Sequence, residues 1–182
     1  MSSLVGGMKN VKIFVLYLMA NLHRPMDFIT LNDIVMQTDY VMYLDFAEAF
    51  HKMLDDGLIE AVGEQDGDTL YYITKKGQCV AEELHSDILK SILDKSLSAA
   101  LRYLDFKARG IEAKCESHRR EDGYYDVTCA LLERGEAIFS ASLMVDSSER
   151  AESMKENFRD HPEVIYRGMY AMLSGNANFL FD

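Results

Sequence analysis

The sequence predicts an α+β protein: three short helices and a β-hairpin, a helical connector, and a three-stranded antiparallel sheet covered by two carboxyl-terminal helices. Apolar residues recur every three or four positions between residues 11 and 57 and again between residues 76 and 104, the period of helices that bury one face. Apolar and polar residues alternate in three runs between residues 111 and 145, the period of strands. The chain of 182 residues, 48% of them hydrophobic, is long enough to bury a core.

The first two helices are predicted from apolar spacing and from their end signals. The first carries a broad apolar face over residues 11–22 and ends before Pro25. We expect the second helix to begin at Thr30, because an Asp three residues later completes a capping pattern. Its apolar stripe reaches about Thr38.

A third helix and a hairpin follow. Asp45, with Glu48 three residues later, repeats the capping pattern, and Gly57 supplies the left-handed stop. Residues 58–62 and 69–73 fit two strands, and the polar residues 64–68 between them have turn chemistry. Three helices followed by a hairpin is the order of a winged helix-turn-helix, in which the third helix and the hairpin loop face DNA.

Two runs of this half carry a family resemblance. The runs M-L-D-D-G-L-I (residues 53–59) and Y-Y-I-T-K-K-G (residues 71–77) resemble the L-x-x-x-G-L-I and Y-x-L-T-x-x-G passages of PadR-like and MarR-like winged-helix regulators. Met53 and Ile73 stand where those passages have Leu. Over its whole length, with E-R-G-E at residues 133–136 and the Pro162 helix, the chain is similar to an uncharacterised bacterial winged-helix family of unknown function. The resemblance implies a DNA-binding transcriptional regulator.

The candidate DNA contacts lie on the third helix and in the hairpin loop. They are Ala47, His51 and Lys52 on the helix and Gln65 in the loop, where such regulators contact base edges and phosphates. Clustering of Lys9 and Lys12 with His51 and Lys52 would favour this function. The expected partner is double-stranded DNA.

The charge of the chain opposes DNA binding. The chain has 19 Lys and Arg against 30 Asp and Glu, a net charge of −11. Residues 1–85 alone hold six Lys and Arg against thirteen acids, which leaves −7 on the half that would face DNA. The alternative function is therefore a winged helix used as a protein-interaction module in a homodimeric scaffold that does not bind DNA.

The segment from residue 76 to residue 104 has leucines at spacings near four. It is one long helix or two pieces meeting near Ser86, and the sequence leaves this open. In PadR-like proteins the helix after the wing forms the dimer interface, so the resemblance implies a homodimer; alternatively, this helix covers the protein's own sheet. The expected domains are residues 1–85, a connector at 86–104, and residues 105–182.

The strand alternation also predicts how the sheet pairs. The apolar faces of the three strands coincide only if both connecting loops have odd lengths. A three-residue loop at residues 122–124 places Cys115 opposite Leu131, and one at residues 134–136 places Leu131 opposite Phe139. Gly123 and Gly135 are then expected in left-handed conformations.

Two helices are expected to close the chain over the sheet. Ser147 or Ser148 caps the first of them, and Pro162 begins the second. A pocket between the sheet and these helices would suit a small-molecule effector, whose identity the sequence does not indicate.

The sequence carries no catalytic or metal-binding motif. The five histidines are scattered singly, and no Gly-rich phosphate loop or nucleophile motif is present, so we expect neither an enzyme nor a cofactor or metal site. Cys79, Cys115 and Cys129 form no C-x-x-C pair and are expected as buried small side chains in a reducing cytoplasm. We expect no signal peptide and no membrane anchor.

Overall fold

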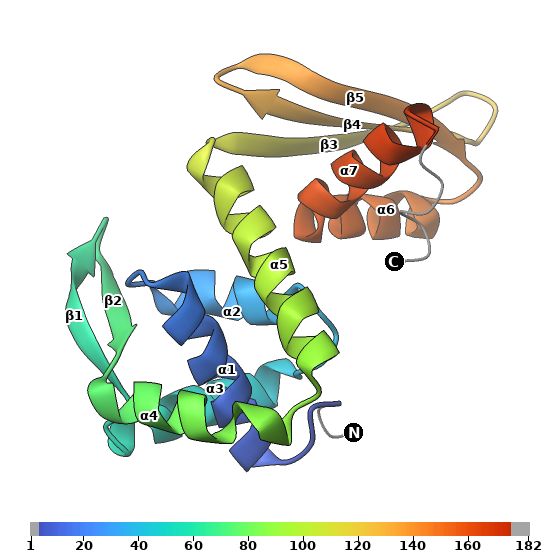
Figure 1. Ribbon diagram of the computed structural model, residues 1–182. Coiled ribbons are helices and arrows are strands. Elements are labelled where there is room, and N and C mark those ends of the chain that lie inside the picture. The colour runs from blue at the N-terminus through green and yellow to red at the C-terminus, as the bar shows by residue number, and fades with distance from the viewer. Residues whose placement is uncertain (1–3, 176–182) are drawn as a thin grey trace. The chain divides into compact units, whose positions relative to one another are not determined.

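The computed structural model describes residues 4–175 (Figure 1). The protein is α+β, as predicted, and the described residues form seven α-helices, a two-stranded hairpin and a three-stranded antiparallel sheet. The chain divides into two compact units between Tyr103 and Leu104. Each unit has its own arrangement of helices and strands.

The first unit is built around helix α1 (Met8–Leu22). This helix is buried along most of its length and packs against α3 (Tyr43–Asp55) and α4 (Lys75–Leu84). Helix α2 (Phe28–Met36) packs on α3. The largest fully buried side chains of the first unit come mainly from these helices, among them Phe14, Phe46, Phe50, Leu31 and Met53.

Two predicted helix starts are wrong. Helix α2 begins after Asp27, whose carboxylate accepts hydrogen bonds from the Thr30 backbone N–H at 2.7 Å and the Thr30 hydroxyl at 2.6 Å. Met26 is held extended by two backbone hydrogen bonds to Tyr71, so the helix starts directly after it. Helix α3 has Met42 at its N-cap and places Asp45 in its first turn, where a negative charge suits the helix dipole.

The hairpin pairs β1 (Ile59–Gln65) with β2 (Asp68–Ile73). Asp66 and Gly67 make its two-residue turn, both with positive φ. Thr74 then caps α4 as predicted, and its hydroxyl accepts a hydrogen bond from the Gly77 N–H at 3.1 Å. The same hydroxyl donates to the carbonyls of Gly57 and Leu58, so the threonine ties α4 to the segment before β1.

The connector consists of two separate helices. Helix α4 ends at Leu84, a single 3-10 turn follows at His85–Asp87, and α5 runs over Lys90–Ala108. The leucine stripe is partly buried: Leu93 and Leu104 of α5 are buried, whereas Leu101 of α5 is 54% exposed and Leu89, just before the helix, is 70% exposed.

Helix α5 also makes polar contacts inside the first unit. The Tyr103 hydroxyl donates to the Asp33 carboxylate at 2.6 Å, and the hydroxyls of Ser96 and Thr38 lie 3.4 Å apart. Ser96 is itself fully buried. The inner face of α5 therefore packs on its own chain.

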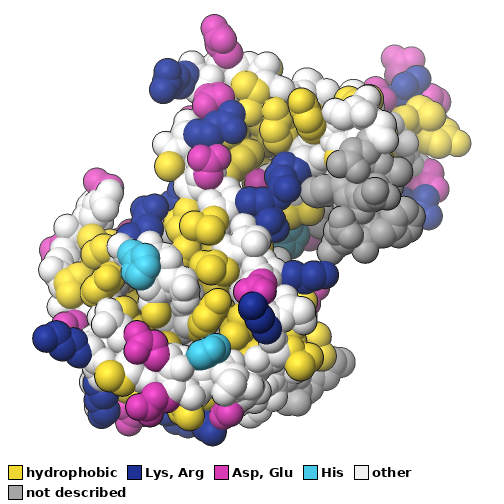
Figure 2. Space-filling view, in the orientation of Figure 1, with side chains coloured by type: hydrophobic (Ala, Val, Ile, Leu, Met, Phe, Trp, Pro, Cys, Tyr) yellow, Lys and Arg dark blue, Asp and Glu magenta, His cyan; other side chains and the backbone are white. Residues whose placement is uncertain are grey.

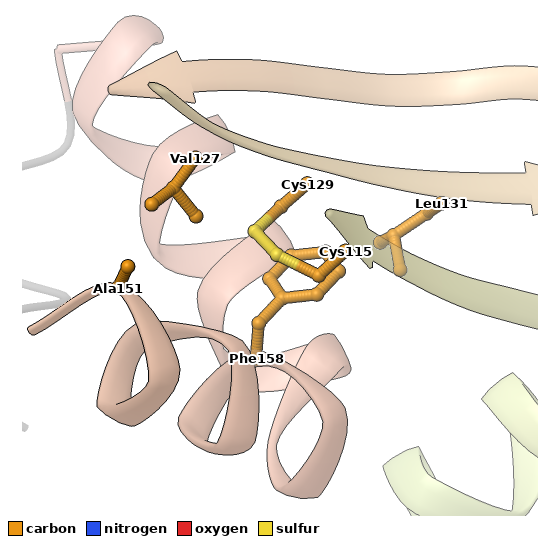
Figure 3. Close-up of a cluster of buried hydrophobic side chains, with 6 residues drawn as sticks. All are labelled: Cys115, Val127, Cys129, Leu131, Ala151 and Phe158. Carbon is orange, nitrogen blue, oxygen red and sulfur yellow. A yellow bond between two sulfur atoms is a disulfide. The ribbon is translucent and has the colours of Figure 1, made fainter. Parts of the chain in front are cut away.

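The second unit contains the sheet β3 (Ile111–Arg119), β4 (Tyr125–Glu133) and β5 (Glu136–Val145), antiparallel in that order. Helices α6 (Ser148–Asp160) and α7 (Pro162–Leu173) pack on one face of it, with Ser147 and Pro162 at their predicted starts. The buried cluster on that face joins side chains from the strands and from α6 (Figure 3): Cys115, Val127, Cys129, Leu131, Ala151 and Phe158.

The β3–β4 loop has an odd number of residues, as predicted, but β3 and β4 pair in a different register. Gly123 has φ 89°, as expected, and it is the last residue of a three-residue loop, the position where such loops need a left-handed residue. The Gly123 N–H donates to the Arg120 carbonyl, and the Arg120 N–H donates to the Tyr124 carbonyl. Because the turn is one residue earlier than predicted, Cys115 lies opposite Cys129 and not opposite Leu131.

The β4–β5 connection reaches the predicted pairing by another route. The turn has two residues, Arg134 and Gly135, both with positive φ, so the expected odd loop is wrong. Leu131 nevertheless lies opposite Phe139, because the register shifts near Leu132 and leaves Ile138 as an extra residue in β5. The extra residue in the bulge shifts the pairing by one position, which is the effect that was predicted for an odd-length loop.

The expectation of three free, buried cysteines is correct only in part: Cys115 and Cys129 are buried but not free, and Cys79 is free but not buried. Cys115 and Cys129 face each other across β3 and β4 and form a disulfide (Figure 3). Cys79 is free but lies exposed on α4. The observed register differs from the predicted one by two residues of β4, and this difference places Cys129 opposite Cys115.

Candidate nucleic-acid interface

Helix α3 has one buried face and one face in solvent. Its buried face consists of Phe46, Ala49, Phe50 and Met53. The Phe50 ring makes edge contacts, 4.9 Å between centroids, with Phe28 of α2 and with Tyr71 of β2. These contacts fix the rotation of α3 about its axis and therefore determine which residues face outward.

Three of the four predicted contact residues share that outward face. His51 and Lys52 are exposed and Ala47, one turn earlier, is half-buried. The face continues toward the start of α3 with Tyr43, 53% exposed, and Leu44, 74% exposed. The start of the face is thus apolar and aromatic, and its end is polar.

Gln65 lies apart from this helix on the hairpin. It is exposed at the last position of β1, paired with Asp68 across the turn. Ile59, the first residue of β1, lies six positions earlier in the strand, a span of about 20 Å. The tip of the hairpin is acidic, because Glu64, Asp66 and Asp68 surround Gln65 in the chain.

Several lysines of the first unit make ion pairs. The Lys52 Nζ lies 2.6 Å from the Glu48 carboxylate one turn earlier on α3, and Lys9 pairs with Asp87 at 2.8 Å. Figure 2 shows cationic and acidic side chains interspersed over the visible face.

Three lysines gather at the carboxyl end of α3. The Lys12 ammonium donates to the Asp56 carboxylate at 3.0 Å, and the Lys76 ammonium donates to the Asp56 backbone carbonyl at 2.6 Å. The hydrogen bond and charge of Lys12, together with the charges of Lys76 and Lys52, lower the pKa of Asp56. Lys12 and Lys52 were predicted candidates and Lys76 was not, because α1, α3 and α4 bring the three together only in the fold.

A small cavity lies beside the hairpin turn. It has a volume of about 240 Å³ and lies between the start of α2 and the turn, within the first unit; its lining is Asp27, Phe28, Ile29, Gly67, Asp68, Thr69 and Tyr71. Two carboxylates in this lining favour a cation over a phosphate. In the second unit, where a pocket between the sheet and the helices was one possibility, Phe139 makes ring contacts with Phe158 and Tyr166 under the sheet.

Over residues 4–175 the structure brings together no group of three or more His, Cys, Asp or Glu side chains that could hold a metal ion. No helix in the same range is both long and apolar enough to span a membrane.

Comparison with known proteins identifies a family. A family model described as "Domain of unknown function (DUF4364)" matches residues 11–173. No curated protein matches the chain, and neither does any solved structure.

Proposed function

The chain belongs to the DUF4364 family, and on that premise we propose that it is a DNA-binding transcriptional regulator of the winged-helix type. The outward face of α3 carries the proposal. That face is held in solvent by the aromatic contacts of Phe50 and is followed directly by the β1–β2 hairpin, the element order of DNA-binding winged helices.

The two halves of the α3 face suit two kinds of DNA contact. Recognition helices contact base edges mainly through their first turns, where this helix presents Tyr43, Leu44 and Ala47. Small and apolar side chains there suit the methyl group of thymine. His51 and Lys52, in the later turns, suit phosphates, and Gln65 at the hairpin tip suits the DNA backbone.

The lysine cluster at the end of α3 supplies local positive charge within an acidic half. Lys12, Lys52 and Lys76 surround Asp56. The pair between Lys52 and Glu48 is an exposed i,i+4 contact of about 0.3–0.5 kcal/mol, so a phosphate can displace Glu48 at small cost. We propose that the protein acts in the cytoplasm as a homodimer on double-stranded DNA, with the second unit for dimerisation or effector sensing.

Selection of bound sequences from random duplexes, with a salt titration of the selected site, tests this function. We expect an enriched sequence and a negative salt slope. The variant His51→Ala/Lys52→Ala removes one to two phosphate contacts, so it should bind more weakly and reduce the slope by about 1–2.

The matched control removes the same two residue types from the second unit. Lys114 and His118 are exposed on β3 and, like Lys52, each lies near a glutamate. Lys114→Ala/His118→Ala should bind DNA as the unmodified protein does. No enriched sequence, or equal losses in the two double variants, would contradict the proposal.

The second candidate function is a protein-interaction module that does not bind DNA. It is favoured by the acidic hairpin tip and by the exposure of Tyr43 and Leu44 at the start of α3. Affinity capture with Tyr43→Ala/Leu44→Ala tests it, with Leu89→Ala, at another exposed leucine, as the control. A protein partner lost only from the double variant would support this function; recovery of DNA without a stable protein partner would exclude it.

A further inference from the structure

The two edge strands of the β3-β4-β5 sheet differ in their charge. Edge strands carry unpaired backbone N–H and C=O groups that can pair with another chain, and charged side chains discourage such pairing. Every residue on the outer face of strand β3 has an ionisable side chain, and so does the last residue of the strand. These residues are Glu112, Lys114, Glu116, His118 and Arg119. This edge is protected.

Strand β5 has no such protection. Residues 137–145 contain no ionisable side chain, in a protein in which 27% of all residues are charged. Leu143 is 55% exposed on the face that α6 and α7 cover in part, where it lies opposite the buried Val127. Met144, on the other face, is 57% exposed. An apolar side chain is therefore exposed on each face of the same edge.

The backbone of β5 is also available for pairing. Within residues 4–175, the backbone hydrogen bonds of this strand are those of its ladder with β4. The extra residue Ile138 interrupts the strand near its start, and bulges twist an edge away from pairing. The regular, uncharged stretch is thus the seven residues 139–145.

We propose that this stretch pairs with the same stretch of a second copy, antiparallel, with Ser142 opposite Ser142. Two copies of a chain with net charge −11 repel each other, so a contact surface that is locally uncharged favours their close approach. In a two-fold arrangement the same patch meets itself, and residues 139–145 then place no charge opposite another. A β3 edge in that position would place charged side chains against the neutral strand.

The proposed pairing joins two sheets into one of six strands. Directly opposite residues of an antiparallel pair point to the same face, so Leu143 meets Ala141 of the second copy and Met144 meets Ser140. Both exposed apolar side chains gain neighbours, and the α6 and α7 helices of both copies lie on the same side of the joined sheet. This interface is separate from α3 and does not depend on DNA binding.

The oligomeric state of edge variants is the first test, measured by sedimentation or light scattering. We expect the unmodified protein to be a dimer and Leu143→Lys/Met144→Lys to be a monomer, because each introduced ammonium group would be placed against an uncharged strand and the two at position 143 would be diagonal neighbours on one face. Val62→Lys is the control, since Val62 is an apolar strand residue of the hairpin, 47% exposed; it should stay dimeric. A monomeric unmodified protein, or a dimeric double variant, would overturn the proposal.

Crosslinking tests the register without changing the apolar residues. In a Cys79→Ser background, Ser142→Cys places two thiols directly opposite each other, within the Cα separation that a disulfide spans. Mild oxidation should therefore give a covalent dimer. Ser140→Cys is the matched control: its two copies would be offset by four residues along the strands, about 13 Å, and should not crosslink. Failure of Ser142→Cys to crosslink, or crosslinking through Ser140→Cys instead, would contradict the proposed pairing.

Discussion

Gly77 occupies a position in which the fold has no room for a side chain. A Cβ atom there would overlap the backbone carbonyl oxygen of Leu58 and lie 2.8 Å from Cγ1 of Ile73. The glycine lets the first turn of α4 pack directly against the segment that leaves α3. The last residue of the Y-Y-I-T-K-K-G run therefore has a packing role.

We predict that Gly77→Ala lowers the free energy of unfolding by about 1–3 kcal/mol or more, because backbone atoms must move to admit the methyl group. Urea unfolding followed by circular dichroism measures the change. Gly63→Ala is the control: nothing lies within 4 Å of the added atom, so its effect should stay below about 1 kcal/mol. Equal effects of the two variants would show that packing against Leu58 is unimportant.

Residue-level signals in the sequence were reliable where they act locally. Thr74 caps α4 through the N–H three residues later, a contact that its position in the run predicts. Thr30 misled the prediction of the α2 start, because Asp27 caps that helix after Met26 has paired with the distant Tyr71. The need for glycine at position 77 was equally invisible, since Leu58 lies nineteen residues earlier in the chain.

At the scale of elements, the disulfide joins two strands that are already paired by hydrogen bonds. Cys115 and Cys129 close a loop of about fifteen residues, and a loop of that length contributes about 3 kcal/mol by restricting the unfolded chain. We predict one titratable thiol per denatured chain without reductant, from Cys79, and three with it. Reduction should also lower the melting temperature.

The control for this prediction is Cys79→Ser, which removes the exposed thiol. This variant should show no thiol without reductant and the same loss of stability on reduction. Three thiols in the unreduced, denatured protein would contradict the disulfide.

The elements themselves follow the sequence pattern closely, and their connections follow it less well. The periods of three to four and of two predicted the order of helices and strands in the described chain, although they left open whether residues 76–104 form one helix or two. The β4–β5 pairing was correct although its loop was wrong, because a bulge at Ile138 and an odd loop have the same effect on side-chain parity. The apolar faces of the strands predict which side chains share a face. They do not predict whether an odd-length loop or a bulge produces that alignment.

The same distinction applies to the candidate interface. The helical period placed Ala47, His51 and Lys52 on one face of α3, as the structure has them. Lys76 escaped notice because its contact with Asp56 needs α4 to return to the end of α3. Contacts between residues of different helices depend on how the helices pack. They leave no periodic pattern in the sequence.

At the scale of the whole molecule, net charge gives the two proposed associations opposite responses to salt. Each copy carries −11, and salt screens the repulsion between copies over a Debye length of about 10 Å at 0.1 M. We predict that dimerisation strengthens as salt increases, whereas DNA binding weakens through loss of counterion release. Sedimentation and duplex-binding titrations over one salt series measure both.

The dimerising surface decides whether this contrast holds. An interface made of complementary ion pairs would weaken with salt, so a dimer that dissociates at high salt would contradict an uncharged contact at β5. A salt-independent duplex affinity would likewise contradict phosphate contacts by the α3 lysines.

The course of α5 limits how this protein can be divided for study. The boundary between the two compact units, at Tyr103 and Leu104, falls inside this helix, which continues to Ala108. A fragment that stopped at the boundary would leave the helix end frayed beside Tyr103, whose hydroxyl binds Asp33. Fragments of the first unit should therefore extend through Ala108, and fragments of the second should begin at Lys90 so that Leu104 keeps its helical turn.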